Sequence, residues 1–136
     1  MKTNELKCPD LRIGNYVNHY DPINGTNIYE VFNIRKGGGV SLDNKGQLAS
    51  CTVKDIEPIE LTEELLVKLG FEGEMYEFCL LADDANIAVN LIEHRVDISF
   101  FGNCEAELLI KYNIKYLHQL QNALYLLTNE ELEVEL

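Results

Sequence analysis

The segment PIELTEELLVKLGF (residues 58–71) decides how the chain divides, because the sequence pattern changes there from β to α. Thr62 is typical of a residue that caps a helix N-terminus, and Gly70 is typical of the left-handed residue that ends a helix. Between them, leucines recur at helical spacing and form one apolar face. The segment therefore predicts a short helix that begins after Thr62 and ends at Gly70.

The residues before this segment have the pattern of short antiparallel strands. LRIGNYV (11–17) predicts a first strand with a bend at Gly14, and IYEVFNI (28–34) predicts another, since both contain β-branched and aromatic residues. Turn-forming residues (18–27) separate them, and further short strands follow. Roughly four or five short strands in residues 1–58 predict a small antiparallel barrel of the Src-homology-3-like kind.

The residues after the segment predict antiparallel strands followed by a C-terminal helix. The strand patterns lie at 75–82, 86–94, 96–102 and, less clearly, 106–112. The expected fold class is therefore α+β, with the barrel in residues 1–58 and an α-β-meander-α unit in residues 59–136.

The C-terminal helix, predicted to begin near Tyr116, combines a leucine stripe with an uncharged polar strip. Four polar residues fall together opposite the leucines, and a fifth lies at the boundary between the two sides. The four are His118, Gln121, Asn122 and Tyr125, and the fifth is Gln119. Such a strip is either the solvated side of the helix, with Gln and His able to hydrogen-bond to a neighbouring strand, or a dry contact surface. A dry surface would pack on the barrel, on a second subunit, on a partner or on a ligand. After it, Thr128 and Glu131 have the spacing of a capping box, which predicts one more helical turn.

Charge is concentrated in the second half of this chain of 136 residues. Residues 1–60 hold eight acidic and seven basic side chains, whereas residues 61–136 hold fifteen acidic and four basic side chains, for a total net charge of −12. Because nucleic acids and anionic membranes attract basic surfaces, direct binding to either is disfavoured. The acidic half serves either solubility or a basic protein partner.

The cysteine pattern favours reduced thiols and no metal site, and the N-terminus favours a cytoplasmic location. The four cysteines form no CxxC pair and are expected to be reduced, mostly buried thiols. No apolar run approaches the roughly 20 residues of a membrane span, and residues 1–11 lack the apolar region of a secretory signal. We therefore expect a cytoplasmic protein with no metal and no cofactor. The cysteines are Cys8, Cys51, Cys79 and Cys104.

Sequence motifs give little support for catalysis. None of the three histidines lies in a GxSxG, HExxH or HxE…CxxC pattern. KGGGV (36–40) lacks the spacing of a phosphate-binding loop and is expected to be a hairpin tip, and Asp83 and Asp84 are expected to be turn residues. The chain is predicted not to be an enzyme, with an unrecognised hydrolase as a less favoured reading.

Three motifs together resemble a known group of proteins. DLRIGNYV near the start, PIELTEELLVKLGF in the middle and YLHQLQNALYLLTNEELEVEL at the end are similar to a family of small uncharacterised proteins of Bacteroidetes genomes, prophages and phages. The one departure noted is Asn129, where the resemblance leads us to expect Gly; both residues tolerate a left-handed turn. The resemblance implies an accessory gene of a phage or mobile element and brings no enzymatic activity.

Two binding functions are predicted from these observations. The first is a non-enzymatic protein-interaction module that acts on a host or phage protein, with host defence as the expected target. The second is an oligomeric binder that sequesters a nucleotide immune signal. In that alternative the phosphates need cations, and the expected contributors are Arg12, Arg35 and Lys36.

Overall fold

The computed structural model describes residues 10–81, 85–100 and 107–134. The protein is α+β, with two antiparallel sheets and a C-terminal helix. Contacts divide it into two compact units: the first extends to Ile59 and includes Tyr116–His118, and the second comprises Glu60–Lys115 and continues from Gln119. None of the described helices has the length and apolar character needed to cross a membrane.

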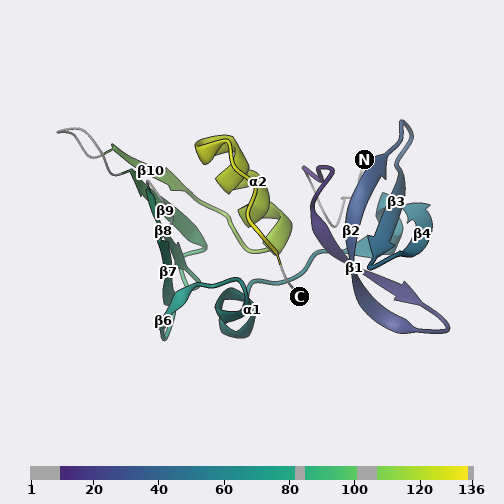
Figure 1. Cartoon of the computed structure of the whole chain (residues 1–136), viewed down its shortest axis with the longest axis horizontal. Helices are drawn as coiled ribbons and strands as arrows, with labels where there is room; N and C mark the ends of the chain where they lie inside the picture. The colour runs from purple at the N-terminus through teal and green to yellow at the C-terminus, as the bar shows by residue number, and fades with distance from the viewer. Residues whose placement is uncertain (1–9, 82–84, 101–106, 135–136) are drawn as a thin grey trace, which may run out of the picture. The chain divides into compact units, whose positions relative to one another are not determined.

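The first unit is a five-stranded antiparallel sheet in the order β4-β3-β2-β1-β5 (Figure 1). Strand β1 pairs with β2 along its whole length and with β5 at two positions. A short 3₁₀ helix, η1, directly precedes β5. The elements are β1 (Tyr16–Asp21), β2 (Gly25–Ile34), β3 (Gly39–Asn44), β4 (Gln47–Thr52), η1 (Val53–Asp55) and β5 (Ile56–Glu57).

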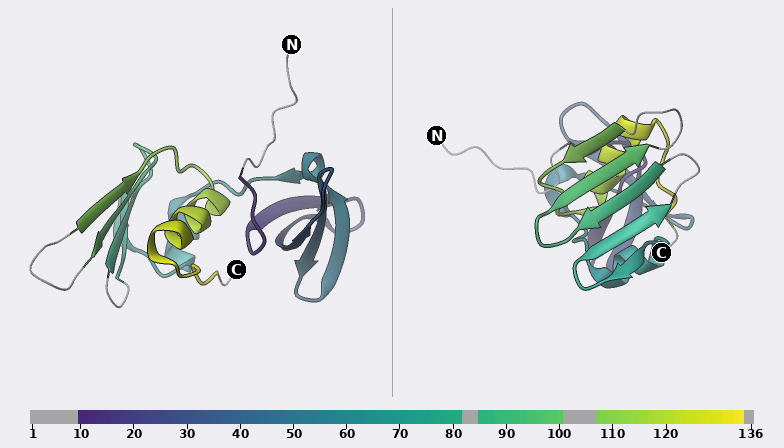
Figure 2. Two further views of the ribbon diagram at one scale, coloured as in Figure 1. Left: turned by 90° about the horizontal axis from the view of Figure 1, so that it is seen from above. Right: turned by 90° about the vertical axis from the view of Figure 1, so that its left-hand side faces the viewer.

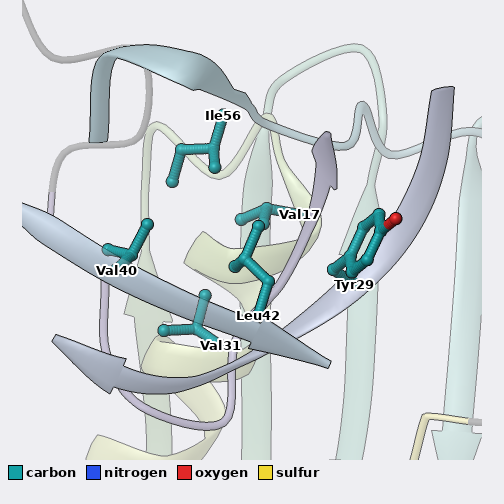
Figure 3. Packing of buried hydrophobic residues seen from close by; sticks show 6 residues of the cluster. All are labelled: Val17, Tyr29, Val31, Val40, Leu42 and Ile56. Atoms are coloured by element: carbon teal, nitrogen blue, oxygen red, sulfur yellow. The ribbon is translucent and has the colours of Figure 1, made fainter. Parts of the chain in front are cut away.

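The core of the first unit is a cluster of apolar side chains from four of its strands (Figure 3). All six are at most 1% exposed, and along each strand they alternate with more exposed residues, as expected for a sheet with one buried face. The cluster consists of Val17, Tyr29, Val31, Val40, Leu42 and Ile56.

The first strand begins later than the sequence pattern predicts. Residues 11–15 form a turn: the Asn15 amide donates to the Arg12 carbonyl at 3.0 Å, and Gly14 has a left-handed φ of 98°. The strand instead covers Tyr16–Asp21 and so includes residues predicted to be a turn. Pairing with β2 outweighs the weak strand propensity of these residues, and the hairpin turn is confined to 22–24.

The second unit contains a five-stranded antiparallel sheet in the order β10-β9-β8-β7-β6, in which each strand pairs with its neighbour in sequence. Strand β6 has no counterpart in the sequence prediction, because its residues, EGE, have low strand propensity and form a strand only by pairing with β7. The elements are α1 (Glu63–Lys68), β6 (Glu72–Glu74), β7 (Glu77–Leu81), β8 (Ala85–Asn90), β9 (Arg95–Phe100), β10 (Glu107–Lys111) and α2 (Leu117–Thr128).

Helix α1 has the two ends that its sequence predicts. The Thr62 hydroxyl accepts a hydrogen bond from the Leu65 amide at 3.2 Å. At the other end Gly70 has a φ of 96°, and its amide donates to the Val67 carbonyl at 3.0 Å. The Phe71 amide then donates to the carbonyl three residues before the C-cap, at 2.9 Å, which completes a Schellman motif.

Helix α2 ends at a single left-handed residue rather than continuing into another turn. Asn129 has a φ of 61°, and its amide donates to the Tyr125 carbonyl at 2.8 Å. The predicted capping box of Thr128 and Glu131 is wrong, since no helix follows in residues 129–134. The Thr128 hydroxyl instead donates to the Leu124 carbonyl at 2.5 Å, within the helix that it ends.

We predict that Thr62→Ala lowers the free energy of unfolding by about 1 kcal/mol, because the Leu65 amide loses its side-chain acceptor. Thr62→Ser keeps that acceptor and is expected to unfold like the wild type. Urea unfolding followed by far-ultraviolet circular dichroism measures both, and equal midpoints for the alanine and serine variants would contradict the role of the cap.

Candidate functional site

The sheet of the second unit has one buried and one open face. Large apolar side chains from three neighbouring strands are buried. Helix α2 lies along one face of this sheet (Figure 1). The right-hand view of Figure 2 shows the opposite face, over which no described helix or strand of this unit lies. On this open face Arg95 pairs with Asp97 at 2.9 Å and with Glu93. The buried side chains are Phe78, Ile87, Val89, Val96 and Ile98.

A half-open pocket of about 410 Å³ lies in the second unit. Five of its apolar residues come from the end of α1, from β7, from β8 and from α2, and its other residues come from the last turn of α2 and the segment that follows. The five apolar residues, which we call the floor, are Leu69, Leu80, Ala85, Ile87 and Leu124. The remaining residues, which we call the rim, are Thr128, Glu130, Glu131, Leu132 and Glu133.

The pocket lies where both helices stop. Gly70 follows the floor residue Leu69 and ends α1, while Asn129 follows Thr128 and ends α2. Both residues have a positive φ, which turns the chain away from the helix axis. Neither helix therefore extends over the apolar residues of the sheet at this point, and a space lined by them is left.

The rim is strongly acidic. Three of its five residues are glutamates, and all three side chains are exposed. Burial alternates along the segment, with Glu131 and Glu133 exposed and Leu132 and Val134 half-buried. This alternation is typical of an extended segment with one side on the protein. The sequence LTNEELEVEL contains this alternation of acidic and apolar residues, but interpreting Thr128 as a helix cap predicts another helical turn instead.

The polar strip predicted on α2 is largely buried. His118 and Gln121 are 0% and 1% exposed, although the helix also buries its leucine stripe. Gln119 and Asn122 are half-buried, and Tyr125 is 40% exposed. Helical periodicity predicts a single buried stripe, and it cannot reveal a helix that is buried on two sides. A partner-binding role for these five residues stays a prediction, and the two most buried ones offer no accessible surface in this chain.

Two of these strip residues make contacts that fix the start of α2. The Gln119 side-chain oxygen accepts a hydrogen bond from the Lys115 amide at 2.8 Å. The His118 ring stacks on the Tyr116 ring with centroids 6.1 Å apart. These contacts give part of the strip a local structural role.

The cations proposed for phosphate binding do not line the pocket. The Arg35 guanidinium donates to the Ser41 hydroxyl at 2.6 Å and to the Ser50 hydroxyl at 3.2 Å, across the first sheet. Arg12 donates to the Ile13 carbonyl at 3.3 Å. Lys36 is exposed in the loop between β2 and β3, which is the hairpin tip that the sequence predicts and is followed by a strand.

The thiols in the described residues are poorly suited to nucleophilic attack. Cys51 and Cys79 are not in disulfides. Burial raises the pKa of the Cys51 thiol, with a smaller contribution from Asp55 and an opposing one from Arg35, and burial together with Glu77 raises the pKa of Cys79. A raised pKa leaves less thiolate at neutral pH. The other two cysteines and the Asp83-Asp84 pair lie outside the described residues.

No metal site emerges from residues 10–81, 85–100 and 107–134, in which no group of three or more His, Cys, Asp or Glu side chains is placed to hold an ion. Comparison with protein-family models, with curated proteins and with solved structures found no match to this chain. The pocket and its charges are therefore the features of this chain that bear on function.

We predict that Gln121→Glu destabilises the isolated protein by roughly 2 kcal/mol or more at pH 7, because an ionised carboxylate replaces a buried amide. Burial raises the folded-state pKa of the new carboxyl above its unfolded value of about 4.3, so the loss shrinks as the pH falls toward 4. Thermal unfolding across this pH range measures the effect.

The matched control is Gln47→Glu, the same chemical change at an exposed position of β4. It is expected to alter the free energy of unfolding by less than about 0.5 kcal/mol. Equal stability of the two variants at pH 7 would show that Gln121 is solvated.

Proposed function

We propose that this protein is a non-enzymatic interaction module that binds a basic partner protein through its second unit. The observation that carries the proposal is the pocket, in which an apolar floor is bordered by three exposed glutamates. As an accessory protein of a phage or mobile element, which the sequence resemblance implies, it would act on a host or phage protein, with host defence as the target.

The floor and the rim would contribute to partner binding in different ways. Burial of apolar surface at the centre of a protein interface favours association. Exposed charges contribute little affinity each, but they accelerate association and select the partner's charge. Residues 61–136, with fifteen acidic and four basic side chains, favour a basic partner and disfavour an acidic one.

The first unit is proposed to be the small Src-homology-3-like barrel that its sequence suggests. Two observations support a curled sheet: β1 lies between β2 and β5, and the Val53 amide donates to the Gly38 carbonyl at 2.8 Å, beyond the strand ladders. In this proposal the barrel is a scaffold, because its buried cluster is complete within its own strands.

Sequestration of a nucleotide has weaker support. A phosphate site at Arg35 would compete with the two serine hydroxyls that already accept from its guanidinium. The pocket itself presents carboxylates, which repel phosphate. The same experiment that tests the proposal can include cyclic nucleotides, because a ligand at 100 times its dissociation constant raises stability by about 2.7 kcal/mol.

We predict that affinity capture from host lysate enriches proteins with basic surfaces, and that Glu130→Gln, Glu131→Gln and Glu133→Gln together abolish the enrichment. The matched control neutralises Glu72, Glu74 and Glu77, three equally exposed glutamates on β6 and β7, and should retain the captured proteins. Quantitative mass spectrometry compares the three samples at low and high salt.

The expected salt dependence is a loss of capture as the ionic strength rises, since exposed charges are screened. Equal capture by the rim variant and the control variant would contradict a role for the pocket. Stabilisation by a nucleotide, with no protein captured, would favour sequestration instead.

A further inference from the structure

The dimensions and chemistry of the pocket restrict what it can hold. Its volume of about 410 Å³ is near the lower end of the roughly 300–1,000 Å³ range of ligand pockets, which leaves room for a large side chain but not for a folded element. The floor consists only of aliphatic side chains, so the buried part of the occupant must be apolar.

The spacing of charges on the rim restricts the occupant further. Glu131 and Glu133 are exposed on either side of the half-buried Leu132, an alternation typical of an extended segment with one side on the protein. Alternate residues of an extended chain are about 6.6–6.8 Å apart, so a second extended chain beside this segment would present its own alternate residues at the same interval. Two basic side chains at positions i and i+2 of a partner would meet these two carboxylates.

The residue between those two basic positions would point to the opposite side of the partner chain, because side chains alternate along an extended backbone. The half-buried Leu132 lies between Glu131 and Glu133 on the inner side of the rim, next to the floor. An apolar residue of the partner at this central position would therefore be directed toward the pocket.

We propose that the pocket takes one large apolar side chain from an extended partner segment of the form basic–apolar–basic, whose two basic residues pair with Glu131 and Glu133. This deepens the proposed function and rests on it. The occupant is a peptide segment, since the three carboxylates of the rim repel nucleic acids and anionic lipids.

The test uses fluorescein-labelled peptides and the full-length protein, with binding followed by fluorescence anisotropy. The probe is Gly-Gly-Lys-Leu-Arg-Gly-Gly, and two controls replace its Leu by Ser or both its basic residues by Glu. We expect the Leu peptide to bind at least about tenfold more tightly than the Ser peptide, as burial of one leucine side chain allows. The Glu-containing peptide should not bind.

Variants of the protein locate the binding. The double variant Glu131→Gln with Glu133→Gln should lower the affinity for the Leu peptide roughly threefold to tenfold at low salt. The control Glu72→Gln with Glu74→Gln should change that affinity less than about twofold. Thr128→Phe places a ring at the rim and should abolish binding, and Thr26→Phe on an exposed position of β2 should not.

Equal binding of the Leu and Ser peptides, or binding of the Leu peptide weaker than about 1 mM, would overturn the inference even if a variant fails to fold, because both peptides are compared on the wild type. If the rim glutamates are needed to capture basic proteins but the peptide does not bind, the basic–apolar–basic segment is wrong. The proposed function, binding of a basic partner protein, would then stand. Failure of both experiments would remove the pocket as a binding site.

Discussion

The apolar face of the second sheet must be covered, and the helices that cover it stop before they reach its end. Gly70 and Asn129 end α1 and α2 through left-handed backbone conformations, with φ values of 96° and 61°. Leu69 and Leu124, which precede these two residues, form the floor of the pocket together with Leu80, Ala85 and Ile87 of the sheet. The position of the candidate site is thus a consequence of where two short helices can no longer continue.

The two units are proposed to divide the roles of stability and recognition. The first buries a cluster of six apolar residues from its own strands (Figure 3). The second leaves a pocket with exposed carboxylates beside it. Arg95, one of the four basic residues of the acidic half, pairs with Glu93 and Asp97 on the open face of the sheet.

Local signals were predictable from the sequence, whereas features that depend on pairing or on distant residues were not. The bounds of α1 follow from Thr62 and Gly70, which act within one turn of the helix. Strand β6 escaped prediction because only its pairing with β7 makes EGE a strand. The burial of His118 and Gln121 likewise depends on packing around two sides of α2, and neither residue type indicates burial by itself.

The pocket itself was beyond sequence analysis for the same reason. Leu69, Ile87 and Leu124 are far apart in the chain, and a single sequence does not say that they meet. The net charge of residues 61–136 follows directly from the sequence. It could not distinguish the three glutamates beside the pocket from the other acidic residues of that half.

The most direct test of the account is a methyl NMR titration of the full-length protein, labelled at Ile, Leu and Val methyl groups, with the Lys-Leu-Arg peptide. The account predicts that the largest shifts fall on Leu80, Ile87 and Leu124 in the floor. Val17, Val31 and Val40 in the core of the first unit should remain unchanged. Shifts confined to the first unit, or no shifts at saturating peptide, would contradict the claim that the pocket is the recognition site.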